Sequence, residues 1–133
     1  MTRKIPTRKE PTSAATNYAR KAQEFFDSML EAATRHRWNA AASLAIHAVI
    51  SITDAVLTRH WGERSISKKH GDTAHLLATR LGTKEAHNYA VKLGQLLSKK
   101  SLAEYDNRMI TPREAGELMR EAERYYLWAK SLL

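Results

Sequence analysis

The chain of 133 residues contains no cysteine and only three prolines and five glycines. Without cysteine there can be no disulfide bond, no thiolate metal site and no cysteine nucleophile, and the composition suits a reducing compartment. The N-terminus has basic residues but no apolar run behind them, so we do not expect a secretory signal. These absences together predict a cytoplasmic protein.

Acidic residues are fewer than basic residues. The chain has 22 Lys and Arg against 14 Asp and Glu, a formal net charge of +8. Such a balance suits a nucleic acid or another polyanion as partner. One stretch, residues 38–57, is apolar enough to suggest a transmembrane helix, but it contains Asp54, which a bilayer would penalise. We therefore predict a buried central helix and no membrane partner.

The length allows one domain. Residues 1–11 contain two prolines and no periodicity, which predicts a flexible basic arm ahead of a helical bundle over residues 12–133. Apolar residues at spacings of three and four predict helices over residues 13–34, 39–60, 73–81, 84–105 and 112–132. The last one begins with a capping box of Thr111 and Glu114 around Pro112. Because no segment alternates with period two, we predict no sheet. The expected fold class is all-α, an up-and-down four-helix bundle with one extra short helix.

A polar line runs along the otherwise apolar helix at residues 39–60. It consists of Ser43, His47, Ser51, Asp54 and Thr58. His47 and Asp54 lie seven residues apart, two turns on one face. Polar groups on a buried helix need hydrogen bonds, a cavity or a partner. The line therefore predicts either a satisfied core network or subunit interface, or the floor of a binding cleft.

A basic loop follows this helix and carries Arg64, Lys68, Lys69 and His70. If Arg64 and His70 converge on a phosphate, Arg64 would stabilise its charge and His70 would act as general acid or base on a ribose 2′-OH. That arrangement predicts RNA cleavage without a metal. The alternative is an ordinary basic loop in which Ser67 or Asp72 caps the next helix.

Further candidates for RNA binding are Lys100 and Tyr105, near the end of the predicted helix at residues 84–105. Tyr125 and Trp128 lie on an apolar stripe and are expected in the core. The six histidines lack the spacing of a zinc site, and phosphate-binding glycine loops are absent. We predict no metal and no cofactor.

Three segments, residues 38–77, 96–108 and 111–130, together resemble the HEPN superfamily (higher eukaryotes and prokaryotes nucleotide-binding). The resemblance rests on an Asp late in the second helix, a His after the next loop, and a Lys…Tyr-Asp helix end. It covers residues 17–133 and implies a four- to five-helix bundle, usually a homodimer with its cleft at the two-fold axis. Ribonuclease members carry an Arg and a His with four to six residues between them. Arg64 and His70 match that spacing, and so do Arg80 and His87.

The resemblance implies three possible partners, RNA, a nucleotidyltransferase and an antitoxin. Our first hypothesis is a toxin or defence component that binds RNA and cleaves it through Arg64 and His70, with His47, Asp54 and Lys100 in support. The second is a dimeric interaction module without catalysis, with the polar helix line as its interface. A third is DNA binding through the basic arm.

Overall fold

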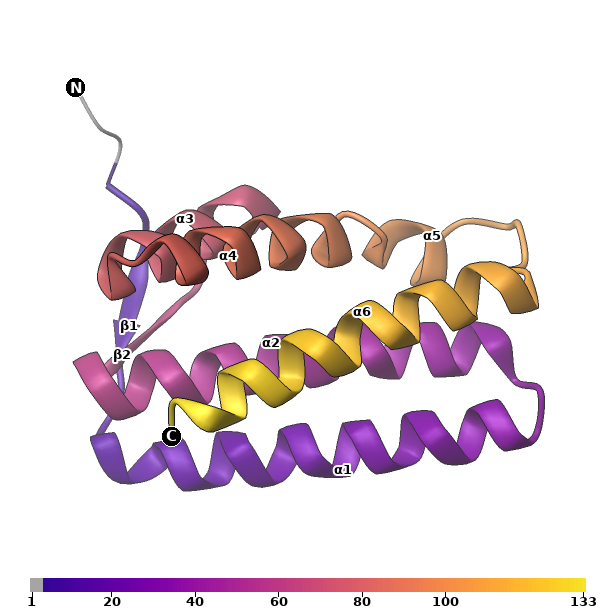
Figure 1. Cartoon of the computed structure of the whole chain (residues 1–133), viewed down its shortest axis with the longest axis horizontal. Coiled ribbons are helices and arrows are strands. Elements are labelled where there is room, and N and C mark those ends of the chain that lie inside the picture. Colours follow the sequence, from indigo (N-terminus) through magenta and orange to yellow (C-terminus); the bar gives the residue numbers. More distant parts are fainter. Residues whose placement is uncertain (1–3) are drawn as a thin grey trace.

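The computed structural model describes residues 4–133, and of His70 only the backbone. Two long antiparallel helices form one side of the molecule, three shorter helices form a second layer, and the last helix crosses between them (Figure 1). The helices are α1 (Ala15–Thr34), α2 (Trp38–Trp61), α3 (His70–Leu81), α4 (Lys84–Leu97), α5 (Lys100–Glu104) and α6 (Pro112–Ser131), with a 3-10 turn at Thr12–Ala14. Helices dominate the described chain, so the all-α prediction holds in this coarse form.

The central helix α2 is covered on almost every side. It is long and apolar enough to cross a membrane by composition, but 72% of its most apolar window is buried inside the protein. Ala41, Ala42 and Ala45 are fully buried, and such small side chains let neighbouring helices approach closely. The prediction of a buried central helix is thus confirmed.

Helix α6 connects three other helices through the aromatic residues near its end. The Tyr125 hydroxyl lies 2.6 Å from Thr53 Oγ1 of α2. The Tyr126 ring stacks on Phe26 of α1 at 4.8 Å between ring centroids. The predicted core positions of Tyr125 and Trp128 are therefore confirmed, since both are buried.

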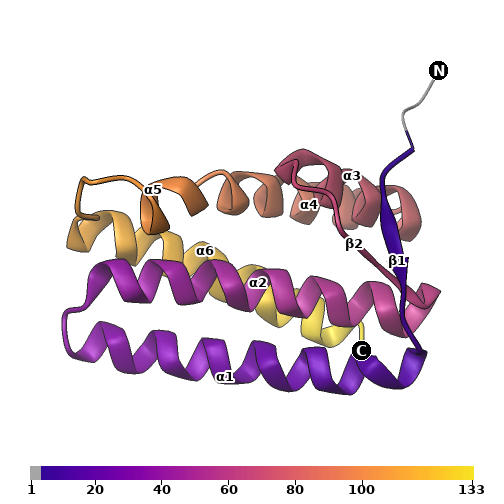
Figure 2. The same cartoon turned by 180° about the vertical axis from the view of Figure 1, so that it is seen from behind.

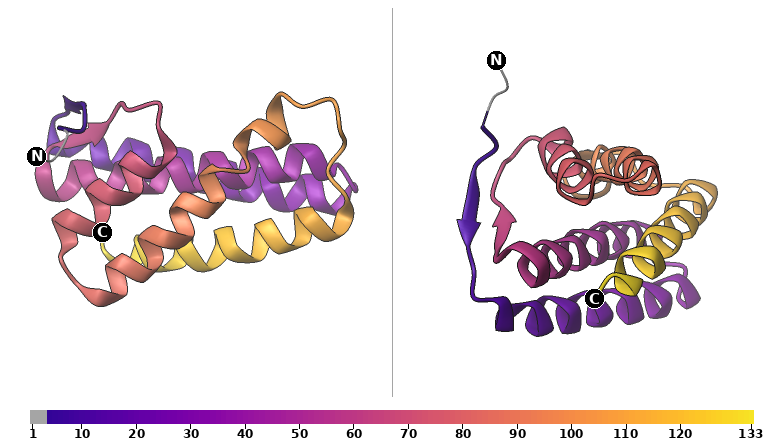
Figure 3. Two further views of the ribbon diagram at one scale, coloured as in Figure 1. Left: turned by 90° about the horizontal axis from the view of Figure 1, so that it is seen from above. Right: turned by 60° about the vertical axis from the view of Figure 1, so that its left-hand side comes forward.

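Trp128 makes the third of these connections. Its ring stacks on Tyr89 of α4 at 4.4 Å, and its indole N–H donates to Glu85 at 2.8 Å. Seen from above in Figure 3, α6 runs beside α2, and α4 approaches the C-terminal end of α6. The three aromatic side chains thus hold both layers together.

The prediction of no sheet is wrong. β1 (Thr7–Lys9) pairs antiparallel with β2 (Glu63–Ser65), with Arg8 opposite Arg64. Figure 2 shows the two strands side by side at the end of the molecule where α2 ends. Part of the predicted arm is therefore an element. Three residues are too few to display a period, and the partner strand lies far away in sequence.

Helix boundaries also differ from the prediction. The helix predicted over residues 84–105 is broken into α4 and α5. The capping box of Thr111 and Glu114 is present in both directions, as the sequence predicted. Gly82 ends α3 in the left-handed conformation, with φ of 69°, which glycine adopts without strain.

Tyr125→Phe should lower the free energy of unfolding by about 1 kcal/mol. The Thr53 hydroxyl already donates to the Val49 carbonyl at 2.7 Å, so Tyr125 donates to Thr53, whose oxygen would lose that partner. Chemical denaturation measures the change. Tyr126→Phe is the matched control and should cost less, because Gln23, its partner, is partly exposed and water can replace the hydroxyl. Equal destabilisation by the two variants would contradict the role of the buried hydroxyl.

Candidate functional site

A hollow of about 440 Å³ lies between α2, the segment that follows it, and α4 and α5. We call it the basic pocket because four of its described lining residues are cations: Arg64, Lys68, Lys69 and Lys100. Arg64 comes from β2, the two lysines from the loop before α3, and Lys100 from the first residue of α5. Cations from three separate segments of the chain thus surround one space.

Asp54 of α2 also lines the basic pocket and is the only carboxylate among its described lining residues. Its exposed fraction is 9%, and it makes no hydrogen bond or ion pair with any residue the structure describes. Burial raises the pKa of Asp54 to about 7, the nearby Arg64 charge opposes that rise, and Glu10 adds to it. The carboxyl group can therefore be protonated or ionised near neutral pH.

Arg64 is held at the pocket by the N-terminal segment. The Arg64 Nε donates to Glu10 Oε1 at 3.3 Å, and the Tyr18 hydroxyl donates to the same oxygen at 3.0 Å. The hydrogen bond from Tyr18 and the Arg64 guanidinium hold the pKa of Glu10 below its usual value. Gly62, with φ of 66°, ends α2, and its carbonyl accepts from the Glu10 backbone N–H. The N-terminal segment therefore fixes the strand that carries Arg64.

Hydroxyl groups shape the loop that carries Lys68 and Lys69. Ser65 Oγ accepts from the Thr73 hydroxyl at 3.0 Å and from the Ser67 backbone N–H at 3.3 Å. Ser67 Oγ donates to Asp72 at 2.6 Å and accepts from the Lys69 backbone N–H. These bonds tie the loop to the start of α3, but neither Ser67 nor Asp72 caps this helix as the alternative of an ordinary basic loop expected, because its N-cap is Lys69 and it has no side-chain cap hydrogen bond. The same bonds leave both lysine side chains exposed to solvent.

Five of the eight site residues chosen from sequence line this one pocket: Asp54, Arg64, Lys68, Lys69 and Lys100. His47 and Tyr105 are not among its lining residues. Tyr105 has an exposed fraction of 75% beyond the end of α5. His70 begins α3, but its side chain lies outside the described part of the structure.

The residues of the polar line on α2 have different surroundings. His47 Nε2 lies 2.7 Å from Glu104 Oε1 of α5, and the Ser43 hydroxyl donates to the same carboxylate at 2.9 Å. Burial opposes ionisation of Glu104, but the Ser43 hydrogen bond and the interaction with His47 outweigh it and lower its pKa. Ser43, His47 and Glu104 thus form a partly buried polar cluster that fastens α5 to α2, whereas Asp54 lines the pocket.

The second Arg and His pair with the family spacing does not assemble a site. Arg80 of α3 is ion-paired with Glu63 of β2, and its side chain lies over the Trp61 ring. Neither Arg80 nor His87 lines the basic pocket. Arg80 instead lines a separate hollow with Lys9 and His75, and His87 does not. Of the four residues in the two pairs, Arg64 is the one that the described lining of the basic pocket contains.

The sequence did not indicate that Glu10 interacts with Arg64. It also did not indicate that the apolar residues Ile50, Leu93 and Leu97 line the pocket. Glu10 lies 54 residues from Arg64, and no local pattern signals their interaction. Leu93 and Leu97 belong to the apolar stripe of α4 and have the spacing of ordinary core residues. Among the described residues, no group of three His, Asp or Glu side chains is placed to hold a metal ion.

Two comparisons of the sequence with known proteins found no match. No protein-family model matches the chain, and a search of curated proteins finds no significant match. The resemblance to the HEPN superfamily therefore stays a prediction from residue patterns.

Asp54→Asn should raise the free energy of unfolding at pH 8 by up to about 4 kcal/mol. The unfolded chain ionises Asp54 near its ordinary pKa of 3.8, whereas the folded chain keeps the proton until about pH 7. The stability that this group contributes is thus greatest at low pH and falls as pH rises from about 4 to 7. Denaturation of both proteins from pH 4 to 8 tests this: the difference should grow across that window. A difference that is constant with pH would show that Asp54 has an ordinary pKa.

Proposed function

We propose that this protein binds RNA or a nucleotide by enclosing a phosphate group in the basic pocket. The observation that carries the proposal is the convergence of Arg64, Lys68, Lys69 and Lys100 on one hollow. Phosphate contacts from Lys and Arg supply most of the affinity of proteins for nucleic acids. Arg64 offers a planar donor set that fits phosphate oxygens, and the lysines add point charges.

The charge balance of the pocket supports the same proposal. Four cations face one carboxylate among the described lining residues, and Asp54 is itself neutral in part near pH 7. Lys68 and Lys69 are exposed and reach outward, while Arg64 is more enclosed, with a side-chain exposed fraction of 27%. An incoming strand would meet the lysines first and Arg64 deeper in the hollow.

The finer expectations of the family resemblance belong to this proposal. They are a HEPN-like four-helix bundle, a cytoplasmic homodimer, and a role as toxin or defence component beside an antitoxin or nucleotidyltransferase. Such a bundle would consist of the long helices α1, α2 and α6, with α4 and α5 together taking the place of the fourth helix.

Cleavage of the bound RNA is the catalytic form of the proposal. His70 would take the proton from the ribose 2′-OH, whose oxygen attacks the phosphorus and displaces the 5′-oxygen of the next nucleotide. Arg64 would stabilise the charge that builds on the phosphoryl oxygens. The leaving 5′-oxygen takes a proton from water and His70 returns its own proton to solvent, so the products are a 2′,3′-cyclic phosphate and a 5′-hydroxyl. Arg64 lines the pocket, and the His70 backbone begins α3 beside it.

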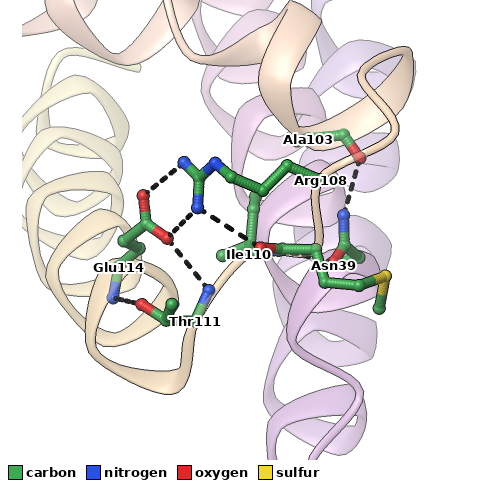
Figure 4. Close-up of polar contacts among 7 residues, drawn as sticks. Asn39, Ala103, Arg108, Ile110, Thr111 and Glu114 are labelled. Carbon is green, nitrogen blue, oxygen red and sulfur yellow. Dashed lines mark hydrogen bonds and ion pairs between the residues drawn. The ribbon is translucent and has the colours of Figure 1, made fainter.

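A second candidate function, a protein interaction module, is favoured by the loop between α5 and α6. Tyr105 and Met109 are 75% and 71% exposed. The loop beneath them is fixed, because Arg108 donates two hydrogen bonds to Glu114, each 2.8 Å long. Figure 4 shows these bonds, with the Arg108 and Glu114 side chains facing each other.

Asn39 of α2 holds the same loop from the other side. Its side chain donates to the Ala103 carbonyl at 3.2 Å and accepts from the Ile110 backbone N–H at 2.8 Å (Figure 4). Exposed aromatic and Met side chains on a rigid support are typical of contact surfaces between proteins. The polar line of α2, which the sequence offered as such an interface, is instead largely covered by the chain itself.

Arg64→Ala and Lys100→Ala should each weaken the binding of a single-stranded RNA oligonucleotide by about tenfold, because each removes a charged hydrogen-bond donor from the phosphate. The slope of log K against log salt should also fall by about 0.7 for each phosphate that is no longer neutralised. Fluorescence anisotropy at several salt concentrations measures both. Arg113→Ala and Lys84→Ala remove exposed cations outside the pocket and are the matched controls. Equal weakening by all four variants would indicate general surface attraction and overturn the proposed site.

In EDTA, the wild-type protein should cleave RNA to products with 2′,3′-cyclic phosphate ends. Arg64→Ala and His70→Ala should each lower the rate by at least about 100-fold, the scale of one general acid-base or electrostatic group. Circular dichroism checks that both variants are folded. Cleavage at equal rates by all three proteins would point to a contaminant. No cleavage with RNA binding intact would leave a binding protein without catalysis, and absence of both activities would favour the interaction module.

A further inference from the structure

The lining of the basic pocket combines apolar, buried acidic and exposed basic side chains. Leu93 and Leu97 are buried, with exposed fractions of 0% and 4%, and Ile50 is partly buried. Asp54 is buried and lies one helical turn after Ile50 on α2, whereas Lys68 and Lys69 are exposed. A matching ligand therefore has an anionic end toward solvent and a flat, largely apolar end carrying N–H donors toward Asp54.

A buried carboxylate without a partner among the described residues is the second observation. Asp54 has an exposed fraction of 9% and lines the pocket with both oxygens free of hydrogen bonds to described residues. An ionised carboxylate accepts only, and its two oxygens match two neighbouring N–H groups on one edge of a planar ring. The carboxylate of Asp54 thus lacks a pair of donors in the pocket.

We propose that the basic pocket is selective for guanine, binding a guanine nucleotide with its base edge on Asp54 and its phosphate among the cations. This inference rests on the proposed function and names its substrate class. Guanine carries the N1–H and the N2 amino group side by side, a pair of donors that matches the carboxylate. The apolar lining residues that keep exposed surface, Ile50 and Ile66, supply the apolar contact for the ring. The volume of about 440 Å³ lies within the range of small-molecule sites.

The other bases fit this carboxylate less well. Adenine places an acceptor, N1, beside its N6 amino group, so one carboxylate oxygen would face a lone pair. Cytosine has the same mismatch at N3, and uracil has one N–H between two carbonyl groups. A site built for two donors rejects a ligand that lacks one, because a buried polar group is then left unpaired.

Proton release accompanies binding of guanine in this arrangement. Ionised Asp54 accepts both bonds, and its pKa of about 7 means that part of the population must lose a proton first. Among the described residues, the charged or titratable groups that line the pocket or act on Asp54 are Arg64 from β2, Lys68 and Lys69 from the loop, Lys100 from α5, Glu10 of the N-terminal segment, Tyr18 of α1 and Tyr125 of α6. The ratio of affinities for guanine over adenine nucleotides should therefore rise about tenfold from pH 6 to pH 8.

The experiment measures dissociation constants of the full-length protein for 5′-GMP, 5′-IMP and 5′-AMP by calorimetry at pH 8. IMP keeps the N1–H and lacks the N2 amino group. We expect GMP to bind about tenfold tighter than IMP and at least that much tighter than AMP. Asp54→Asn should bring GMP close to AMP, because an amide offers one acceptor and one donor. Asp106→Asn, the same change at an exposed residue outside the pocket, should leave the order unchanged.

The failure of this inference differs from the failure of the proposed function. Equal affinity for GMP, IMP and AMP, lowered for all three by Arg64→Ala, overturns guanine selectivity and keeps phosphate binding. A preference for GMP that persists in Asp54→Asn also overturns it. If no nucleotide and no RNA oligonucleotide binds, the proposed function fails and the guanine site fails with it. Selectivity that rises with pH in the wild type alone supports the inference.

Discussion

The structure depends on covering α2 on all sides. This helix has almost no polar face, so α1, α6 and the layer of α3 to α5 each bury part of it. Its small side chains allow close packing, and the aromatic residues of α6 then hold the two layers around it. Burial of apolar surface is the dominant favourable term in folding. Most polar side chains on α2 therefore find a partner inside the protein or a gap in its cover, whereas the buried Thr58 hydroxyl has no hydrogen-bond partner among the described residues.

Both outcomes occur along the same helix. Ser43 and His47 meet Glu104, and Thr53 meets Tyr125, so these groups are satisfied inside the chain. Asp54 instead meets the one side where β2 and its loop replace a helix as cover. The change from helix to strand brings Arg64 and the loop lysines to the same pocket as the carboxylate. The basic pocket is thus a direct consequence of how the cover of α2 is completed.

The spacing of apolar residues and the positions of glycine and proline predicted most of the helices. The run of basic residues after the second long helix predicted much of the site. The spacing of apolar stripes located α1 and α6, the single polar line located α2, and the capping box marked the start of α6. Asp54 and the basic loop were predicted together because α2 and the loop are adjacent in sequence. What escaped prediction depends on distant contacts: β1 pairs with β2 through three residues, and Glu10 reaches Arg64 across 54 residues. His47 was misplaced because no pattern pairs it with Glu104 of α5.

If Asp54 had only a structural role, its burial would lower the stability of the fold without a compensating interaction. Its carboxyl group is buried without a hydrogen bond to the described residues, and its ionisation is opposed by burial. A leucine or asparagine there would avoid that desolvation cost. Perturbed carboxylates in clefts lined by opposite charge are typical of functional sites. A ligand that brings two N–H donors to Asp54 and an anion to the cations would satisfy both halves of the pocket at once. That joint requirement ties the buried carboxylate and the exposed lysines to one ligand rather than to two unrelated features.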